Sequence, residues 1–215
     1  MKSAIKIDLH VHSLYSIDST ITPEQLASYA KIRGLDGVAV TDHDRLDSGL
    51  KISKEINFLV LPGMEVSSRD GHIIGLSIDN PIPKGLPAEE TVDKIHAAGG
   101  IAIACHPSAF LKESLNKHVT AKFDAVEVIN SSSIPFRYSV KRNEELASRL
   151  DIARVAGSDA HYGPEIGCAY TLIDAAPNMD DIAEAIRKKR CQPFGNGIPV
   201  TTRLKRILST VRKRS

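Results

Sequence analysis

The feature that most constrains this chain is the run Lys6-Ile7-Asp8-Leu9-His10-Val11-His12, in which polar and apolar residues alternate. In a strand, successive side chains point to opposite faces, so Asp8, His10 and His12 share one face. Histidines two residues apart in a strand lie roughly 6 to 7 Å from each other, close enough to bind one metal ion. Such a pair is equally typical of two hydrogen-bonded strand histidines, so the other histidines and acids must decide its meaning.

Segments typical of strands and helices alternate along the chain. We predict strands at residues 6–12, 37–41, 58–62, 72–76, 101–105, 125–129, 152–156 and 169–173, and helices at 23–34, 47–56, 88–98, 140–150 and 179–189. Thr22-Pro-Glu-Gln25 is typical of a capping box at the start of the first of these helices. The alternation of strands and helices predicts an α/β protein with a parallel sheet. About seven strand–helix units, with no Gly-x-Gly-x-x-Gly motif or P-loop after any strand, favour a small closed barrel in a single domain over an open doubly wound sheet.

Composition indicates an ordinary globular protein. With 215 residues, 42% of them hydrophobic and 25% charged, the chain can bury a sizeable core. No apolar run approaches the roughly 18 residues of a membrane span, and the first residues lack the apolar core of a signal peptide. We therefore expect a soluble cytoplasmic protein with no membrane contact. Three cysteines without Cys-x-x-Cys spacing indicate neither a disulfide framework nor a thiolate zinc site.

Most histidines and several acids follow the predicted strands, whose ends meet at one mouth in a barrel. The candidate metal ligands are His10, His12, Asp18, His43, Glu65, His72, His106, Asp159 and His161. They include six of the eight histidines, and a buried cluster of this kind is costly to desolvate unless cations bind it. Nine nitrogen and oxygen ligands are too many for one tetrahedral ion. We therefore predict two or three divalent ions (Zn, Mn or Fe), with Glu65 as the natural bridge.

Six pieces of the sequence, in order over about residues 5 to 175, resemble the motifs of the PHP (polymerase and histidinol phosphatase) family of metal-dependent phosphoesterases. They are His10-Val-His12, Thr41-Asp42-His43, Gly63-Met-Glu65, His72-Ile-Ile-Gly-Leu76, His106-Pro107 and Gly157-Ser-Asp159-Ala-His161. The resemblance implies a distorted (β/α)7 TIM-like barrel with a trinuclear metal site. It assigns one ion to His10, His12, Glu65 and Asp159, a second to Glu65, His72 and His106, and a third to Asp18, His43 and His161.

This resemblance implies hydrolysis of a small phosphate ester, such as a nucleotide or metabolite phosphate. Clustered dications lower the pKa of a bound water from about 15.7 towards 7, so that a metal-activated hydroxide attacks phosphorus. The candidate catalytic residues are Asp159, His161 and Glu65, and Asp159 either accepts a proton or orients the hydroxide. Asp8 and Asp42 are predicted to accept hydrogen bonds from ligand imidazoles.

A substrate phosphate usually needs cations in addition to the metals. We predict Arg137, Asn130 and Arg45 as substrate-binding residues, because each follows a predicted strand end. Arg137 is the first choice, since Pro135-Phe136-Arg137-Tyr138 is expected in a long loop at the barrel mouth. A solvated surface position is equally compatible with each of the three.

Three alternatives remain at the level of sequence. An exonuclease or other nucleic-acid-processing phosphodiesterase would use the same metal site. A non-catalytic RNA-binding scaffold, resembling a protein subunit of archaeal RNase P, is disfavoured because it has no need of nine candidate ligands. Amidohydrolases also begin with His-x-His but typically place a metal-bridging Lys at a strand end, where this chain has none.

The C-terminus differs from the rest of the chain. All 26 acidic residues precede Arg187, whereas the residues after it include a strongly basic segment. We predict a barrel over residues 1–195 and a basic amphipathic helix over 196–215 that packs on the barrel or extends from it. Its apolar stripe, Leu204, Ile207, Leu208 and Val211, most simply docks on the barrel. Attraction of a polyanion is the alternative role. Nucleic acid is not the favoured partner, because an extended strand would have to cross an acidic body.

Overall fold

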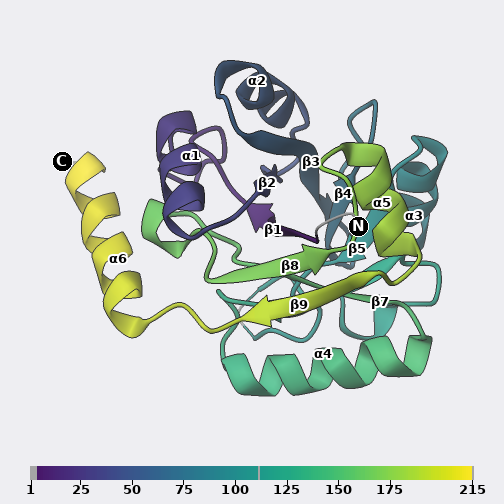
Figure 1. The fold of residues 1–215 in the computed structure, drawn as a ribbon. Coiled ribbons are helices and arrows are strands. Elements are labelled where there is room, and N and C mark those ends of the chain that lie inside the picture. Colours follow the sequence, from purple (N-terminus) through teal and green to yellow (C-terminus); the bar gives the residue numbers. More distant parts are fainter. Residues whose placement is uncertain (1–3, 111, 215) are drawn as a thin grey trace.

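The computed structural model describes residues 4–110 and 112–214, with side chains in the last helix up to residue 208 (Figure 1). Over these residues the strands are β1 (Ile5–Val11), β2 (Gly37–Val40), β3 (Leu59–Ser68), β4 (Gly71–Leu76), β5 (Ile101–Ala104), β6 (Ala125–Asn130), β7 (Ala153–Gly157), β8 (Ala169–Ile173) and β9 (Cys191–Gly195). The α-helices are α1 (Pro23–Ile32), α2 (Asp47–Glu55), α3 (Ala88–Ala97), α4 (Phe136–Leu150), α5 (Met179–Arg187) and α6 (Val200–Arg214). Two short 3-10 helices, η1 (Asn116–His118) and η2 (Gly163–Glu165), lie in loops.

The strands form one sheet in the order β7-β6-β5-β4-β3-β2-β1-β8-β9. A bridge between Val11 and Ala160 brings the end of β1 beside the end of β7, so the sheet nearly closes. The predicted barrel is thereby confirmed. The expectation of a parallel sheet is wrong at β8, which runs antiparallel to β1, and at β4, which runs antiparallel to both β3 and β5. Only Arg69 and Asp70 separate β3 from β4, and a parallel crossover needs about a dozen residues.

Helices α1 to α5 surround the sheet, while α6 stands apart from it (Figure 1). Thr22 begins α1 as predicted, since its hydroxyl accepts from the Gln25 amide and the Gln25 side chain accepts from the Thr22 amide. The apolar core includes a cluster that joins Ile7, Leu61 and Ile103 from three strands. Burial of each such side chain contributes about 1.5 to 3 kcal/mol, so this packing holds the strand ends in place.

The structure differs from the predicted elements at three further places. Strand β3 extends beyond residue 62 to Ser68 and so includes Glu65. Strand β9, which pairs antiparallel with β8, was not predicted. Helix α4 begins at Phe136 rather than near residue 140, because proline is tolerated at a helix start and Pro135 occupies the N-cap. Arg137 therefore lies in the first turn of a helix and not in a long loop.

The C-terminal helix exists as predicted, but the described part of its apolar stripe does not dock. Leu204, Ile207 and Leu208 are 55%, 59% and 65% exposed, and the side chain of Val211 lies outside the described residues. Helical spacing shows that a stripe exists, but it does not show that an apolar partner lies within reach. A polar anchor holds the described start of α6 instead, because the Arg203 guanidinium donates to the carbonyls of Ser131 and Ser132 at 3.0 and 3.3 Å.

No helix in the described residues is long and apolar enough to cross a membrane.

Candidate metal centre

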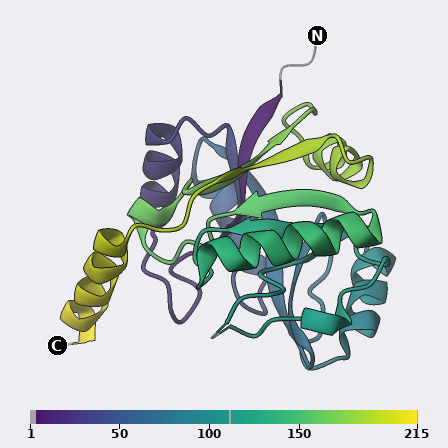
Figure 2. The same ribbon diagram turned by 90° about the horizontal axis from the view of Figure 1, so that it is seen from below.

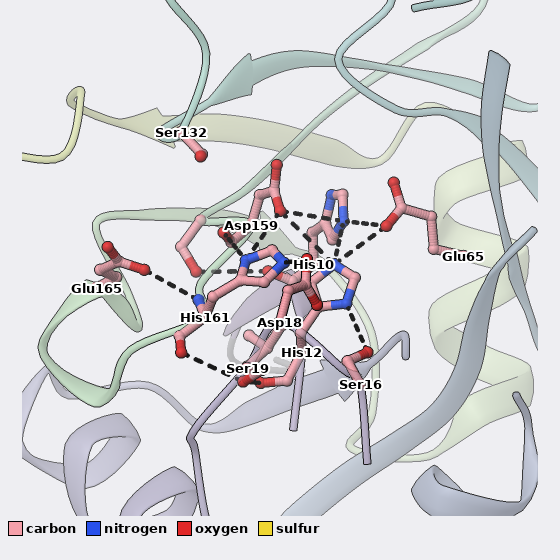
Figure 3. Close-up of polar contacts among 12 residues, drawn as sticks. His10, His12, Ser16, Asp18, Ser19, Glu65, Ser132, Asp159, His161 and Glu165 are labelled. Carbon is pink, nitrogen blue, oxygen red and sulfur yellow. Dashed lines mark hydrogen bonds and ion pairs between the residues drawn. The ribbon is translucent and has the colours of Figure 1, made fainter. Parts of the chain in front are cut away.

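All nine candidate ligands gather at one end of the barrel. They come from β1 and the loop after it, from the ends of β2, β5 and β7, and from the antiparallel pair β3 and β4. Figure 3 shows several of them, including His10, His12 and Asp159, pointing toward one another. The sequence therefore indicated correctly which residues come together, although the sheet is not wholly parallel.

Glu65 lies at the middle of the cluster and is 1% exposed. Its carboxylate oxygens lie 3.0 to 3.4 Å from ring nitrogens of His10, His12, His43, His72 and His106. A carboxylate that faces imidazoles with both oxygens is well placed to bridge two ions, which is the role predicted for it. Cys105 also lies near, with its Sγ 3.4 Å from Glu65 Oε1, but burial raises the pKa of this thiol well above its usual value.

Two further groupings surround this centre. Asp159 Oδ1 lies 3.5 to 3.7 Å from the nearest ring nitrogens of His10, His12 and His161. Asp18 Oδ2 lies 3.0 Å from His161 Nε2 and 3.6 Å from His43 Nε2. The third ligand set implied by the resemblance thus lies within one compact group, to which His12 also contributes a nitrogen.

The donor set fits divalent metal ions. The Nε2 atoms of His10 and His12 lie only 3.1 Å apart, and both also approach Glu65. The buried Nδ1 atom of His106 has no hydrogen-bond partner among the described residues, and a buried polar atom left unpaired costs about 1 to 3 kcal/mol. Bound cations relieve the first of these problems by accepting the converging lone pairs. Imidazole nitrogens with carboxylate oxygens suit Zn, Mn or Fe.

The electrostatics of the cluster keep Glu65, Asp159 and His12 in metal-binding protonation states. Burial alone would raise the pKa of Glu65, but the surrounding His10, His106 and His12 hold it well below its usual value. Burial acts likewise on Asp159, whose pKa is held low by Lys112 and His10. Burial and the neighbouring His161 lower the pKa of His12 to about 4, so this ring is neutral at pH 7 with a lone pair to donate.

Two of the seven described non-glycine residues with positive φ belong to the cluster. His106 and Asp159 are not glycines, yet their φ angles are +34° and +54°. Such conformations cost of order 1 to 3 kcal/mol each and persist where the surrounding structure imposes them. Here they turn the two side chains from the ends of β5 and β7 into the cluster.

Glu127 in β6 orients the cluster and was missed from the sequence. Its Oε1 lies 3.1 Å from His10 Nδ1, and its Oε2 accepts from the His106 amide at 2.8 Å. It also accepts from the Asn130 side-chain amide, which in turn donates to Asp159 at 3.1 Å. A signal for Glu127 did exist, since a lone carboxylate in an apolar strand needs a polar partner when buried.

Asp42 and Asp8 were predicted to accept hydrogen bonds from ligand imidazoles, but the structure gives them other partners. Asp42 acts through a serine, because Ser16 Oγ donates to it at 2.9 Å and lies 3.2 Å from His12 Nδ1. Asp8 accepts backbone N–H groups, including those of Ser158 and Gly167. Burial raises the pKa of Asp8 to about 6.

A cavity of about 800 Å³ opens above the cluster, and its cationic lining residues are not the predicted ones (Figure 3 shows part of its wall). Neither Arg137 nor Arg45 lines this cavity. Arg137 is exposed on α4, and Arg45 pairs with Asp47 at 2.7 Å. Asn130 lies beneath the cavity, where it holds Asp159. Among the described residues, the Lys and Arg side chains that line it are Lys112, Arg203 and Arg206.

Of these three cations only Lys112 follows a predicted strand end, and it is not among the predicted substrate-binding residues. Lys112 lies in the loop after β5 and contacts Asp159. Arg203 and Arg206 belong to α6, and an Arg206 nitrogen lies 3.5 Å from the buried carboxylate of Glu165. No spacing in the sequence relates α6 to the barrel mouth.

Comparisons with known proteins agree with this geometry. The model of the PHP domain matches residues 8–119, and that of a PHP-associated region matches residues 138–191. An uncharacterized protein of Methanocaldococcus jannaschii is 38% identical over 141 residues, which are 59% of this chain and 82% of that protein. A 5'-3' exoribonuclease of Haemophilus influenzae is 35% identical over 86 residues, which are 37% of this chain and 31% of the exoribonuclease.

Solved structures share the fold. A two-domain protein containing a predicted PHP-like metal-dependent phosphoesterase, from Bacteroides vulgatus, superposes with a TM-score of 0.72 over 90% of this chain and 65% of its own, at 15% identity. PsfC from Pseudomonas syringae gives a TM-score of 0.71 over 99% of this chain and 98% of its own, at 16% identity. At these identities the likeness concerns the fold alone.

Proposed function

The chain belongs to the PHP domain family of metal-dependent phosphoesterases, and on this premise we propose that it hydrolyses a phosphate ester held in the cavity above Glu65. The observation that carries the proposal is the convergence of five imidazoles on the two oxygens of one buried carboxylate. A non-catalytic RNA-binding scaffold would gain nothing from this cluster or from the backbone strain at His106 and Asp159.

The nine cluster residues are the proposed ligands of two or three divalent ions. Such ions, when bound, lower the pKa of a coordinated water and draw charge from phosphoryl oxygens. The protein's own part is to hold the ligands in place through Glu127 and Ser16. Lys112 and Arg206 are proposed to bind the remaining phosphate oxygens, since charge-assisted hydrogen bonds are shorter and stronger than neutral ones. Arg203 is proposed mainly to anchor α6, because its guanidinium already donates to backbone carbonyls.

Asp159 is proposed as a catalytic residue together with Glu65 and His161. Its Oδ2 accepts from Asn130 and contacts Lys112, while its Oδ1 faces three histidines. One oxygen therefore faces the metal side of the cluster, and the other lies next to a cation of the cavity wall. This arrangement suits a group that orients the attacking water relative to the phosphate.

The first candidate substrate is a small ester, such as a nucleotide or a metabolite phosphate. A single-stranded nucleic acid end is the second candidate. It is supported by the cationic wall of an open cavity and by the likeness to the Haemophilus influenzae exoribonuclease.

Elemental analysis and turnover test the proposal together. Protein stripped with a chelator and reloaded with Mn²⁺, Zn²⁺ or Fe²⁺ is expected to retain two or three ions per chain. It should also release phosphate or a nucleotide from at least one member of a panel of nucleotides, sugar phosphates and p-nitrophenyl esters. One ion or fewer per chain contradicts the polynuclear site. Absence of turnover across the panel and on oligonucleotides, with the ions bound, contradicts the phosphoesterase.

A further inference from the structure

A second cavity lies beside the metal cluster, on the other side of the loop that follows β5. It measures about 300 Å³ and is bounded by this loop and by one face of α4. Figure 2 shows α4 next to the loop that carries η1. Cavities of this size are large enough to hold part of a small ligand. No residue of this cavity belongs to the metal cluster.

Two aromatic side chains line this cavity and remain exposed. The rings of Phe110 and Tyr138 have centroids 5.3 Å apart and are tilted by 39°. Phe110 is 55% exposed and Tyr138 is 46% exposed. A buried aromatic side chain removes 150 to 250 Å² from water, so an exposed pair gives up much of that stabilisation. Exposed apolar groups that gather beside a cavity commonly mark a binding surface.

Basic side chains surround this pair. Lys117, Arg142 and Arg149 line the cavity, and Glu145 is the one carboxylate among its lining residues, 3.2 Å from Arg142. The surface is therefore basic, although most of the chain before Arg187 is rich in acids. Aromatic rings beside cations are the combination that binds single-stranded nucleic acid, because bases stack on the rings and phosphates pair with the cations.

The two cavities share no described lining residue, but the same loop borders both. The loop that carries Phe110 also carries Lys112, which lines the cavity above the cluster. The Phe110 amide donates to the carbonyl of Ile134 at 3.1 Å, and the Ile134 side chain lines the first cavity. Tyr138 follows four residues later. A chain of nucleotides that leaves the metal cluster on this side would meet the aromatic pair.

We propose that Phe110 and Tyr138, with Lys117, Arg142 and Arg149, form a stacking platform for a nucleoside of single-stranded nucleic acid whose neighbouring phosphate lies at the metal cluster. This inference rests on the proposed phosphoesterase function and selects its second substrate class. It revises the expectation that nucleic acid is not the favoured partner. That expectation used the charge of the whole body, whereas the charge beside the cavity is basic.

Kinetics with two substrates test the platform. The full-length Mn²⁺-loaded protein is compared with the double variant Phe110→Ala/Tyr138→Ala on a short 5'-phosphorylated single-stranded oligonucleotide and on bis(p-nitrophenyl) phosphate. Loss of base stacking should raise KM for the oligonucleotide by about tenfold or more. Turnover of the small diester should stay within about twofold, because neither ring lines the first cavity. Phe194→Ala, which removes an exposed aromatic from β9, is the matched control and should change neither value.

Binding provides a second readout that does not need turnover. Fluorescence anisotropy of the labelled oligonucleotide should show weaker binding by Arg149→Glu, with a less steep dependence on salt. The platform would be overturned if these variants hydrolysed the small diester and also kept the wild-type KM and affinity for the oligonucleotide. That result would leave the proposed phosphoesterase function intact. A wild-type dimer that becomes monomeric in the double variant would also overturn it, because the aromatic pair would then be an interface between copies. Tight oligonucleotide binding that depends on the platform, without any hydrolysis, would support the platform and contradict the proposed function.

Discussion

Two groups of residues face the same cavity and are held in different ways. The nine-residue cluster comes mostly from strands and their ends, and its side chains are fixed by one another and by buried partners such as Glu127. The cations of the cavity wall come from a loop and from α6, whose described apolar residues touch little of the barrel. The difference suggests that the cluster carries the chemistry, while the wall sets which ester binds. The following substitutions test this division.

The largest effect is expected at the cluster itself. His10→Ala and Asp159→Ala should each lower kcat by at least about 10²-fold, since loss of a ligand should exceed the roughly 10- to 100-fold effect of removing a residue that supports one. Elemental analysis of the same samples should show a lower metal content. His96→Ala is the matched control, because His96 lies on α3 and pairs with Asp124 away from the cavity. Near-normal turnover of either ligand variant, at metal concentrations too low to rescue the site, would remove that residue from the cluster's function.

The next effect is expected at Glu127, which touches the cluster without belonging to its predicted ligands. Glu127→Gln keeps the shape but weakens the hydrogen bonds that orient His10 and the His106 amide. We expect metal affinity or kcat to fall by about 10- to 100-fold, which titration with Mn²⁺ would measure. Restoration of kcat at high Mn²⁺ would identify a positioning role. A variant that binds metal and turns over as the wild type does would show that His10 needs no such support.

A smaller effect is expected from the wall. Arg206→Ala should raise KM about three- to tenfold with little change in kcat, because a partly exposed cation contributes on the order of 1 kcal/mol to binding an anion. Steady-state kinetics on a phosphomonoester would measure both constants. Lys205→Ala is the control, since its side chain is exposed and does not line the cavity. A fall in kcat with KM unchanged would contradict the division, because it would place Arg206 in the chemical step.

The smallest effect is expected from the end of α6. Truncation after Thr210 removes three basic residues and leaves every described residue that lines either cavity in place. The value of kcat/KM for a small ester should therefore change by less than about threefold. Assays of the truncated and intact proteins side by side would measure it. A larger loss would show that this segment contributes to the active cavity.

Sequence patterns were sufficient wherever local spacing determines position. The alternation in β1 put His10 and His12 on one face, and the Thr22–Gln25 capping box marked the start of α1. Strand ends meet in a barrel, so residues such as His43 and His106 could be grouped without coordinates. The antiparallel direction of β4 did not change this grouping, since Glu65 and His72 lie on the paired strands β3 and β4, near the same end of the barrel.

The tertiary structure alone decided which cations face the cavity and whether α6 docks. Lys112 reaches Asp159 from a loop, and Arg206 comes from a helix more than forty residues beyond Asp159 in the chain. Strand and helix periods specify which side chains share a face, but they carry no information on the direction in which a loop or a terminal helix leaves the barrel. That direction depends on contacts between distant segments, such as those of Arg203 with Ser131 and Ser132. For the same reason the sequence determined the cluster, and only the folded chain determined its surroundings.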